Sequence, residues 1–153
     1  MLTDKREMIA KARPYFLTCG KYKQAVVSVP YASKSIDMVL IDKKDRLITV
    51  EFEMSNWKRA LNHAREQALG ADKAYICFPA HMTIPPDLKL RAAQQGIGIF
   101  LFYPITGRVE TLLNSVYGPS LTNARNKIIK GLRPSMEAKS AHVSPQCTLP
   151  AMQ

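Results

Sequence analysis

Three acidic residues, Asp37, Glu51 and Glu53, lie in two short apolar runs that have the pattern of neighbouring β-strands. Side chains two positions apart on a strand point to the same face of a sheet, so Glu51 and Glu53 share a face. If residues 43–45 form a three-residue hairpin loop, counting back along both strands places Asp37 opposite Glu51, with Cβ atoms about 5 Å apart. A two-residue loop would shift the pairing by one position and separate the acids.

Carboxylates this close together repel one another unless a cation lies among them. Mg²⁺ is commonly held by one or two carboxylates together with waters and phosphate oxygens. Such an ion polarises a phosphodiester and lowers the pKa of an attacking water. We therefore predict that Asp37, Glu51 and Glu53 bind Mg²⁺ or Mn²⁺, with Glu53 as a ligand or as the base. The alternative is a solvent-facing strand whose acids pair with lysines across the sheet.

A helix is expected directly after these acids, from Asn56 to about Leu69, with Ser55 as its N-cap. Gly70 supplies a suitable stop. The apolar stripe that must pack on the sheet consists of Trp57, Ala60, Leu61, Ala64 and Ala68. One edge of this stripe carries Arg59, His63 and Gln67, and the other carries Lys58 and Arg65.

The elements that position these residues follow from hydrophobic periodicity. Further helices are predicted at residues 3–17, 85–95 and 121–132, and strands at 24–31, 35–42, 46–54, 73–79, 97–104 and 108–114. Pro14 is expected to kink the first helix or end it early. The first three strands can form a meander, whereas the strand at 73–79 is reached through a helix, which implies parallel pairing. The fold class is therefore α/β, with a mixed central sheet flanked by helices.

The chain is strongly basic, with 22 lysines and arginines against 12 acidic residues and a formal net charge of +10. A protein of this charge attracts polyanions through its long-range field, so nucleic acid is the expected partner. In the last helix, Arg125, Lys127, Lys130 and Arg133 could contact the phosphate backbone. A solvated amphipathic face explains the same spacing, and a basic surface with no nucleic-acid role is the simpler reading of the charge.

Several classes of protein are disfavoured by composition. No run of about 18 apolar residues could span a membrane, and the charged N-terminus lacks the apolar core of a signal peptide. The three cysteines are widely spaced, which supports neither a disulfide framework nor a zinc site and suggests a reducing cytoplasm. Residues 1–133 are predicted to form one domain, and the aperiodic residues 134–153 a disordered tail. The oligomeric state stays open, a homodimer included.

The segment SIDMVLIDKKDRLITVEFEMSNWKRALNHA, residues 35–64, resembles the PD-(D/E)xK nuclease superfamily. Asp37 matches the first metal-binding acid, Glu51 the second, and Trp57 to Leu61 the start of the following helix. The resemblance implies a restriction-endonuclease-like αβββαβ core and Mg²⁺-dependent hydrolysis of phosphodiester bonds, in DNA more than in RNA. It also implies that the helix edge with Arg59 and His63 lies near the carboxylates, where both could contact nucleic acid.

Two positions depart from the pattern of the superfamily. Glu53 occupies the place of the usual lysine, and His63 that of the usual glutamine. In some members a third acid replaces the lysine, and in others a lysine comes from a neighbouring element, for which Lys58 is the nearest candidate. A third alternative is a degenerate site in a module that only binds nucleic acid. An unrelated basic interaction protein would bind neither metal nor nucleic acid.

Overall fold

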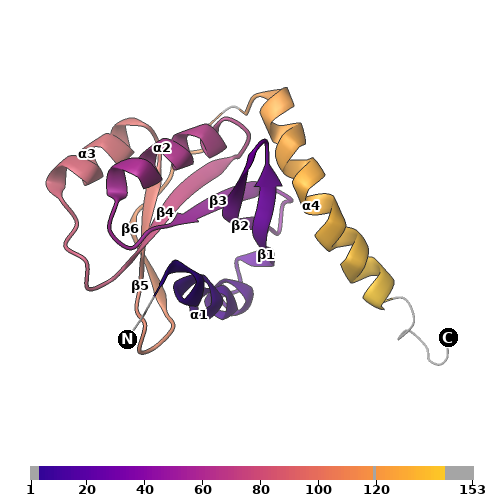
Figure 1. Ribbon diagram of the computed structural model, residues 1–153, viewed down its shortest axis with the longest axis horizontal. Coiled ribbons are helices and arrows are strands. Elements are labelled where there is room, and N and C mark those ends of the chain that lie inside the picture. The colour runs from indigo at the N-terminus through magenta and orange to yellow at the C-terminus, as the bar shows by residue number, and fades with distance from the viewer. Residues whose placement is uncertain (1–3, 119, 144–153) are drawn as a thin grey trace.

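Helices and strands follow one another in the order predicted from the sequence (Figure 1). The computed structural model describes residues 4–118 and 120–143, with side chains to residue 135. The elements are α1 (Lys5–Thr18), β1 (Tyr22–Tyr31), β2 (Lys34–Asp42), β3 (Leu47–Phe52), α2 (Trp57–Ala68), β4 (Lys73–Pro79), α3 (Pro86–Gln94), β5 (Gly98–Phe102), β6 (Val109–Leu113) and α4 (Thr122–Val143). The stretch from α1 to β4 has the αβββαβ order that the resemblance implied.

The six strands form one mixed sheet in the order β1-β2-β3-β4-β5-β6. Strands β1 to β3 pair antiparallel as a meander, and β3, β4 and β5 pair parallel through the α2 and α3 crossovers. Strand β6 returns antiparallel to β5. The predicted α/β fold with a mixed central sheet flanked by helices is therefore confirmed.

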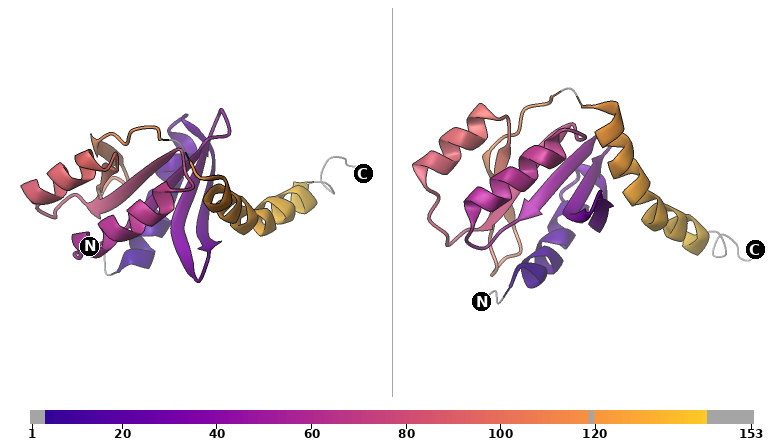
Figure 2. Two further views of the ribbon diagram at one scale, coloured as in Figure 1. Left: turned by 90° about the horizontal axis from the view of Figure 1, so that it is seen from above. Right: turned by 45° about the horizontal axis from the view of Figure 1, so that its top comes forward.

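The helices cover both faces of the sheet (Figures 1 and 2). Helix α1 buries Met8, Ala12 and Phe16 on one face, against strand residues that include Met38 and Val50. Helices α2 and α3 cover the opposite face around β4 and β5. Helix α4 packs beside β1, where Ile128 and Leu132 join a third buried cluster. The face that carries the predicted acids is thus the one that α2 covers.

Two details of the helix ends differ from the prediction. Helix α1 does not end early at Pro14 but continues to Thr18, with Phe16 buried beyond the proline. Helix α2 is capped by Asn56 rather than Ser55, because the Asn56 side chain accepts a hydrogen bond from the Arg59 N–H at 3.2 Å.

The last helix is longer than expected. It was predicted to end at Leu132, and it continues through Pro134 to Val143. The sequence after Pro134 includes Met, Glu, Ala and Lys, which favour helix, although it lacks an apolar stripe. Helix α4 thus reaches as far as Val143 into the segment predicted as a tail, and residues 144–153 lie outside the described part of the chain. No helix of the described residues is long and apolar enough to cross a membrane.

Candidate functional site

The β2–β3 hairpin has the three-residue loop on which the predicted acidic pair depended. The Asp42 N–H donates to the Arg46 carbonyl at 3.1 Å, and Asp45 adopts a positive φ of 62° in the loop. The ladder then runs from the Ile41–Leu47 pair to the Met38–Val50 pair. Asp37 and Glu51 are the next residues in this register, as predicted.

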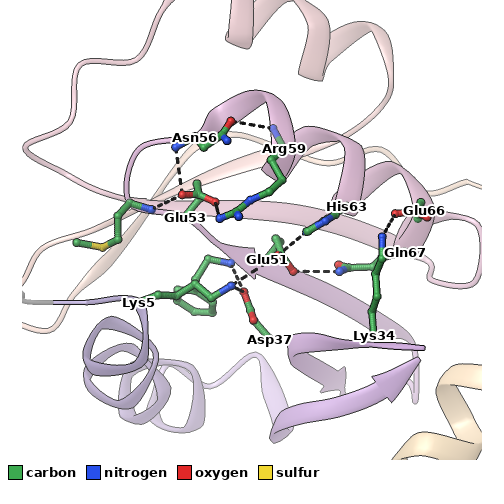
Figure 3. Close-up of polar contacts among 12 residues, drawn as sticks. Lys5, Lys34, Asp37, Glu51, Glu53, Asn56, Arg59, His63, Glu66 and Gln67 are labelled. Atoms are coloured by element: carbon green, nitrogen blue, oxygen red, sulfur yellow. Dashed lines mark hydrogen bonds and ion pairs between the residues drawn. The ribbon is translucent and has the colours of Figure 1, made fainter. Parts of the chain in front are cut away.

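Beyond the Met38–Val50 pair, the Asp37 side chain replaces the main chain of β2 as the hydrogen-bond acceptor for β3. Asp37 Oδ2 accepts a hydrogen bond from the Phe52 N–H at 2.9 Å. Strand β3 meanwhile continues to pair with β4, with Glu51 opposite Ile76. The Asp37 carboxylate is thereby fixed beside β3, next to the Glu51 side chain (Figure 3).

Glu51 is a buried carboxylate, 4% exposed, in a polar setting supplied by α2. Its Oε2 lies 3.1 Å from His63 Nδ1, and its Oε1 accepts a hydrogen bond from Gln67 Nε2 at 3.0 Å. His63 and Gln67 lie one helical turn apart, so both reach the same carboxylate. Burial raises the pKa of Glu51, and the negative charge of Asp37 raises it further.

Lys5, the first residue of α1, supplies the cation at this pair. Its Nζ lies 3.0 Å from Asp37 Oδ2 and 3.8 Å from Glu51 Oε2. Lys5 was not among the predicted site residues, because no local pattern in the sequence indicates where the start of α1 meets the sheet. One weak signal existed: a lysine in the first helical turn is disfavoured by the helix dipole.

Glu53 was predicted to join the acidic pair, and the structure places it elsewhere (Figure 3). Its Oε2 accepts from the N–H groups of Met54, Ser55 and Asn56 at 3.1–3.2 Å, and its Oε1 contacts Arg59 Nη2 at 3.1 Å. Burial opposes the charge of Glu53, but these hydrogen bonds outweigh it and hold its pKa below the usual value. Strand β3 ends at Phe52, so the alternation of side chains that placed Glu53 beside Glu51 no longer applies.

The three-carboxylate cluster expected from the sequence is therefore a pair. Among the described residues, no three His, Cys, Asp or Glu side chains are arranged to hold a metal ion. Two carboxylates suffice for Mg²⁺, which keeps waters and takes phosphate oxygens as its other ligands. Burial is the main cause of the raised pKa of Glu51, and the charge of Asp37 adds to it, so a cation beside the two carboxylates would offset the second cause. In addition, the buried Gln67 Oε1 has no hydrogen-bond partner within the described chain. Asp37 and Glu51 thus fit a hard divalent cation.

The other predicted site residues lie at varying distances from this centre. Lys58 is exposed, with its Nζ 5.7 Å from the centroid of the Trp57 ring, and makes no ion pair with the acids in the described structure. Arg125 Nη1 contacts Asp72 Oδ2 at 3.1 Å. Lys127 and Lys130 are exposed on α4, which packs against β1. Of the predicted nucleic-acid contacts, only His63 touches the acidic pair directly.

Two cavities meet at Asp37 and Lys5. The smaller, of about 300 Å³, lies between α2 and the β1–β2 turn, where Lys34 Nζ contacts Glu66 at 3.4 Å. The larger, of about 920 Å³, lies between α1 and the edge strand β1. Its basic lining residues are Lys5, Arg6, Arg13 and Lys23. Asp37 therefore borders both cavities, whereas Glu51 borders only the smaller one, and the larger cavity is lined by basic side chains.

Comparisons with known proteins show a shared fold. No protein-family model matches the chain, and no curated protein matches it. A protein of unknown function from Silicibacter pomeroyi has a similar structure, with a TM-score of 0.67 at 12% identity over 94% of each chain. EndoMS in complex with double-stranded DNA gives a TM-score of 0.49 at 12% identity, over 68% of this chain and 46% of that one. A repair endonuclease from Pyrococcus abyssi gives 0.46 at 14% identity, over 68% and 49%. The chain spans about half the length of these two proteins.

Proposed function

We propose that the protein is a metal-dependent nuclease, with its reaction centre at Asp37 and Glu51. The observation that carries the proposal is the placement of these two carboxylates side by side, with the Lys5 ammonium 3.0 Å from Asp37 and 3.8 Å from Glu51. Two acids and a lysine are the residue types that the PD-(D/E)xK resemblance requires. The lysine comes from α1 and takes the role of the motif lysine, whose position in the sequence is occupied by Glu53.

Each residue has a distinct role in this proposal. Asp37 and Glu51 hold Mg²⁺ or Mn²⁺, which supplies polarisation of the phosphodiester and acidification of water when bound. Gln67 and His63 orient the Glu51 carboxylate, as outer partners of metal ligands commonly do. The Lys5 ammonium is half-exposed and can donate a hydrogen bond to a phosphate oxygen or to the attacking water.

The substrate proposed for this centre is nucleic acid, DNA more than RNA. The net charge of +10 favours a polyanion. Arg6, Arg13 and Lys23 line the larger cavity, which reaches Asp37, so a phosphate backbone could lie along it. A cytoplasmic location accords with these assignments, and a homodimer is compatible with them.

The same geometry also favours a second function, a module that binds nucleic acid without cutting it. Lys5 already bridges the two acids and neutralises part of their charge without a metal. Glu53, in the motif position of the lysine, already accepts hydrogen bonds from the turn before α2 and from Arg59. In this alternative, the acidic pair and Lys5 form a structural ion pair.

Cleavage assays with single-stranded and duplex DNA, with and without Mg²⁺ or Mn²⁺, distinguish these functions. We expect metal-dependent cleavage that falls by roughly 10³-fold or more in Asp37→Asn and Glu51→Gln, because the metal contributes several kcal/mol to the transition state. Nucleic-acid affinity should be unchanged or tighter, since repulsion with phosphate is lost. Asp87→Asn, on the exposed surface of α3, is the matched control. Binding without cleavage by the wild type would support the module, and equal cleavage by all variants would exclude this centre.

A further inference from the structure

Another polar cavity, of about 310 Å³ and separate from the two beside Asp37, lies at the opposite end of β2 from the acidic pair. Asp42 lies at its edge, five residues along β2 from Asp37, which corresponds to about 17 Å of strand. Its lining also includes Tyr22, Arg46, Lys73, Tyr75 and Tyr117. Nothing in the proposed nuclease reaction uses these residues.

Tyr117 is held in place although its side chain reaches the surface. The residue before it, Val116, donates its N–H to the Gly96 carbonyl at 3.0 Å, and the residue after it, Gly118, donates to the Asp72 carbonyl at 3.2 Å. Tyr117 itself is 47% exposed. Its ring is therefore pre-positioned by main-chain contacts rather than by burial, as expected of a binding residue.

Two cations lie against this one ring. The Arg46 guanidinium carbon is 4.5 Å from the centroid of the Tyr117 ring, and Lys73 Nζ is 4.1 Å from it. Each contact is favourable by itself, but the two positive charges repel each other. An anion that contacts both cations would offset this repulsion.

The nearby carboxylate neutralises only part of this cluster, because its ion pair is with Arg46 alone. Asp42 Oδ2 accepts from Arg46 Nε at 2.8 Å, and its Oδ1 accepts from the Lys44 and Arg46 N–H groups at 2.9 Å. Lys21 and Lys43 also line the cavity. Lys21, Lys43 and Lys73 form no ion pair within the described part of the chain. The lining thus has four basic residues and one acid, whose oxygens are already engaged.

We propose that this cavity binds a phosphate group, supplied either by a free nucleotide or by the backbone of a nucleic acid. A phosphate carries enough charge and enough acceptor oxygens to contact Arg46 and Lys73 at once. The cavity is also lined by the neutral polar side chains of Thr111 and Asn114. Tyr22 lines the same cavity, and its phenolic hydroxyl, protonated at neutral pH like that of any tyrosine, can donate to the anion. The proposal is independent of the acidic pair and of any metal.

Titration of the metal-free protein with inorganic phosphate, followed by amide NMR shifts, tests the site. We expect saturable shifts around Tyr117 and Lys73, and a dissociation constant that rises about tenfold in Lys73→Gln, as the loss of one charge-assisted hydrogen bond predicts. Lys43→Gln, in the exposed hairpin loop, should also raise the dissociation constant for phosphate, without affecting folding. Lys89→Gln, on the exposed surface of α3, removes the same charge elsewhere and should change nothing.

Two further titrations separate the sources of the phosphate. The cavity takes a free nucleotide if two results hold. A nucleoside 5′-monophosphate should shift these amides with a lower dissociation constant than inorganic phosphate, and Lys73→Gln should leave oligonucleotide affinity unchanged. If Lys73→Gln weakens oligonucleotide binding more than Lys89→Gln does, it takes a backbone phosphate. The proposal is overturned if phosphate shifts are spread over all basic surfaces, or if Lys73→Gln and Lys89→Gln behave alike with every ligand.

Discussion

At the scale of single residues, Glu51 and Lys5 determine what the site can do. Glu51 is buried on the sheet next to another carboxylate, and Lys5 is the cation that compensates the pair. The position of Glu51 could be predicted, because strand alternation and a three-residue hairpin loop fix it. Lys5 could not, because its contact with Asp37 depends on how α1 docks against the sheet, which no local pattern indicates.

Replacement of Glu51 by Gln should stabilise the metal-free protein. The pKa of Glu51 is raised on folding, so its contribution to stability is present below its unfolded pKa and is lost as the pH rises through the folded value. The variant should therefore have a Tm higher by roughly 2–5 °C at pH 7, the size of a change of about 1 kcal/mol. Thermal melts at pH 4 and pH 7 check this, since the difference should shrink at acid pH. A lower Tm at pH 7 would contradict it.

Replacement of Lys5 by Met should separate metal binding from cleavage. Lys5 competes with a divalent cation for Asp37 and Glu51, so its removal should tighten Mn²⁺ binding measured by calorimetry. Cleavage should nevertheless fall by about 10²-fold, the size of a lost proton-transfer or water-positioning group. Lys11→Met, which removes an exposed lysine from the same helix, is the control. Unchanged cleavage in Lys5→Met would show that the lysine is only structural.

At the scale of elements, the turn from β3 into α2 explains why the acidic cluster is a pair. Strand β3 ends at Phe52, and the Glu53 side chain turns to the free N–H groups at the start of α2. Strand order and register were predictable from loop lengths and alternation. The direction of Glu53 was not, because alternation applies only while the chain remains in the strand.

Replacement of Glu53 by Gln should destabilise the protein rather than remove a ligand. The pKa of Glu53 is lowered on folding, so it stabilises the protein above its unfolded pKa, and this contribution is lost as the pH falls through the folded value. We expect a loss of about 1–2 kcal/mol at pH 7, typical of a weakened helix cap, and a smaller loss near pH 3. Urea denaturation measures it, with Glu66→Gln on exposed α2 surface as the control. If Glu53→Gln loses cleavage while its stability is unchanged, Glu53 belongs to the reaction centre.

At the scale of the whole molecule, a net positive charge accompanies an acidic centre. The formal net charge is +10, and basic side chains line both the large cavity beside Asp37 and the cavity beside Tyr117. Composition alone predicted an affinity for polyanions. It could not locate the two cavities, because each is built from segments far apart in the sequence.

Nucleic-acid affinity should therefore depend steeply on salt. Each neutralised phosphate releases counterions, so about four phosphate contacts predict a loss of roughly 10²-fold in affinity between about 50 and 200 mM salt. Fluorescence anisotropy with a labelled duplex measures this dependence. Absence of binding at low salt would show that the positive charge does not serve to bind nucleic acid.

The most direct test of the reaction centre is the location of Mn²⁺ by anomalous scattering from crystals of the protein grown with the ion. The two-carboxylate geometry predicts one strong peak bound by Asp37 and Glu51, with the Lys5 ammonium displaced from between them and Glu53 still bound to α2. The peak should be absent from Asp37→Asn crystals under the same conditions. A wild-type protein without a peak at this pair at saturating Mn²⁺, or with Mn²⁺ bound elsewhere, would contradict the proposed nuclease centre.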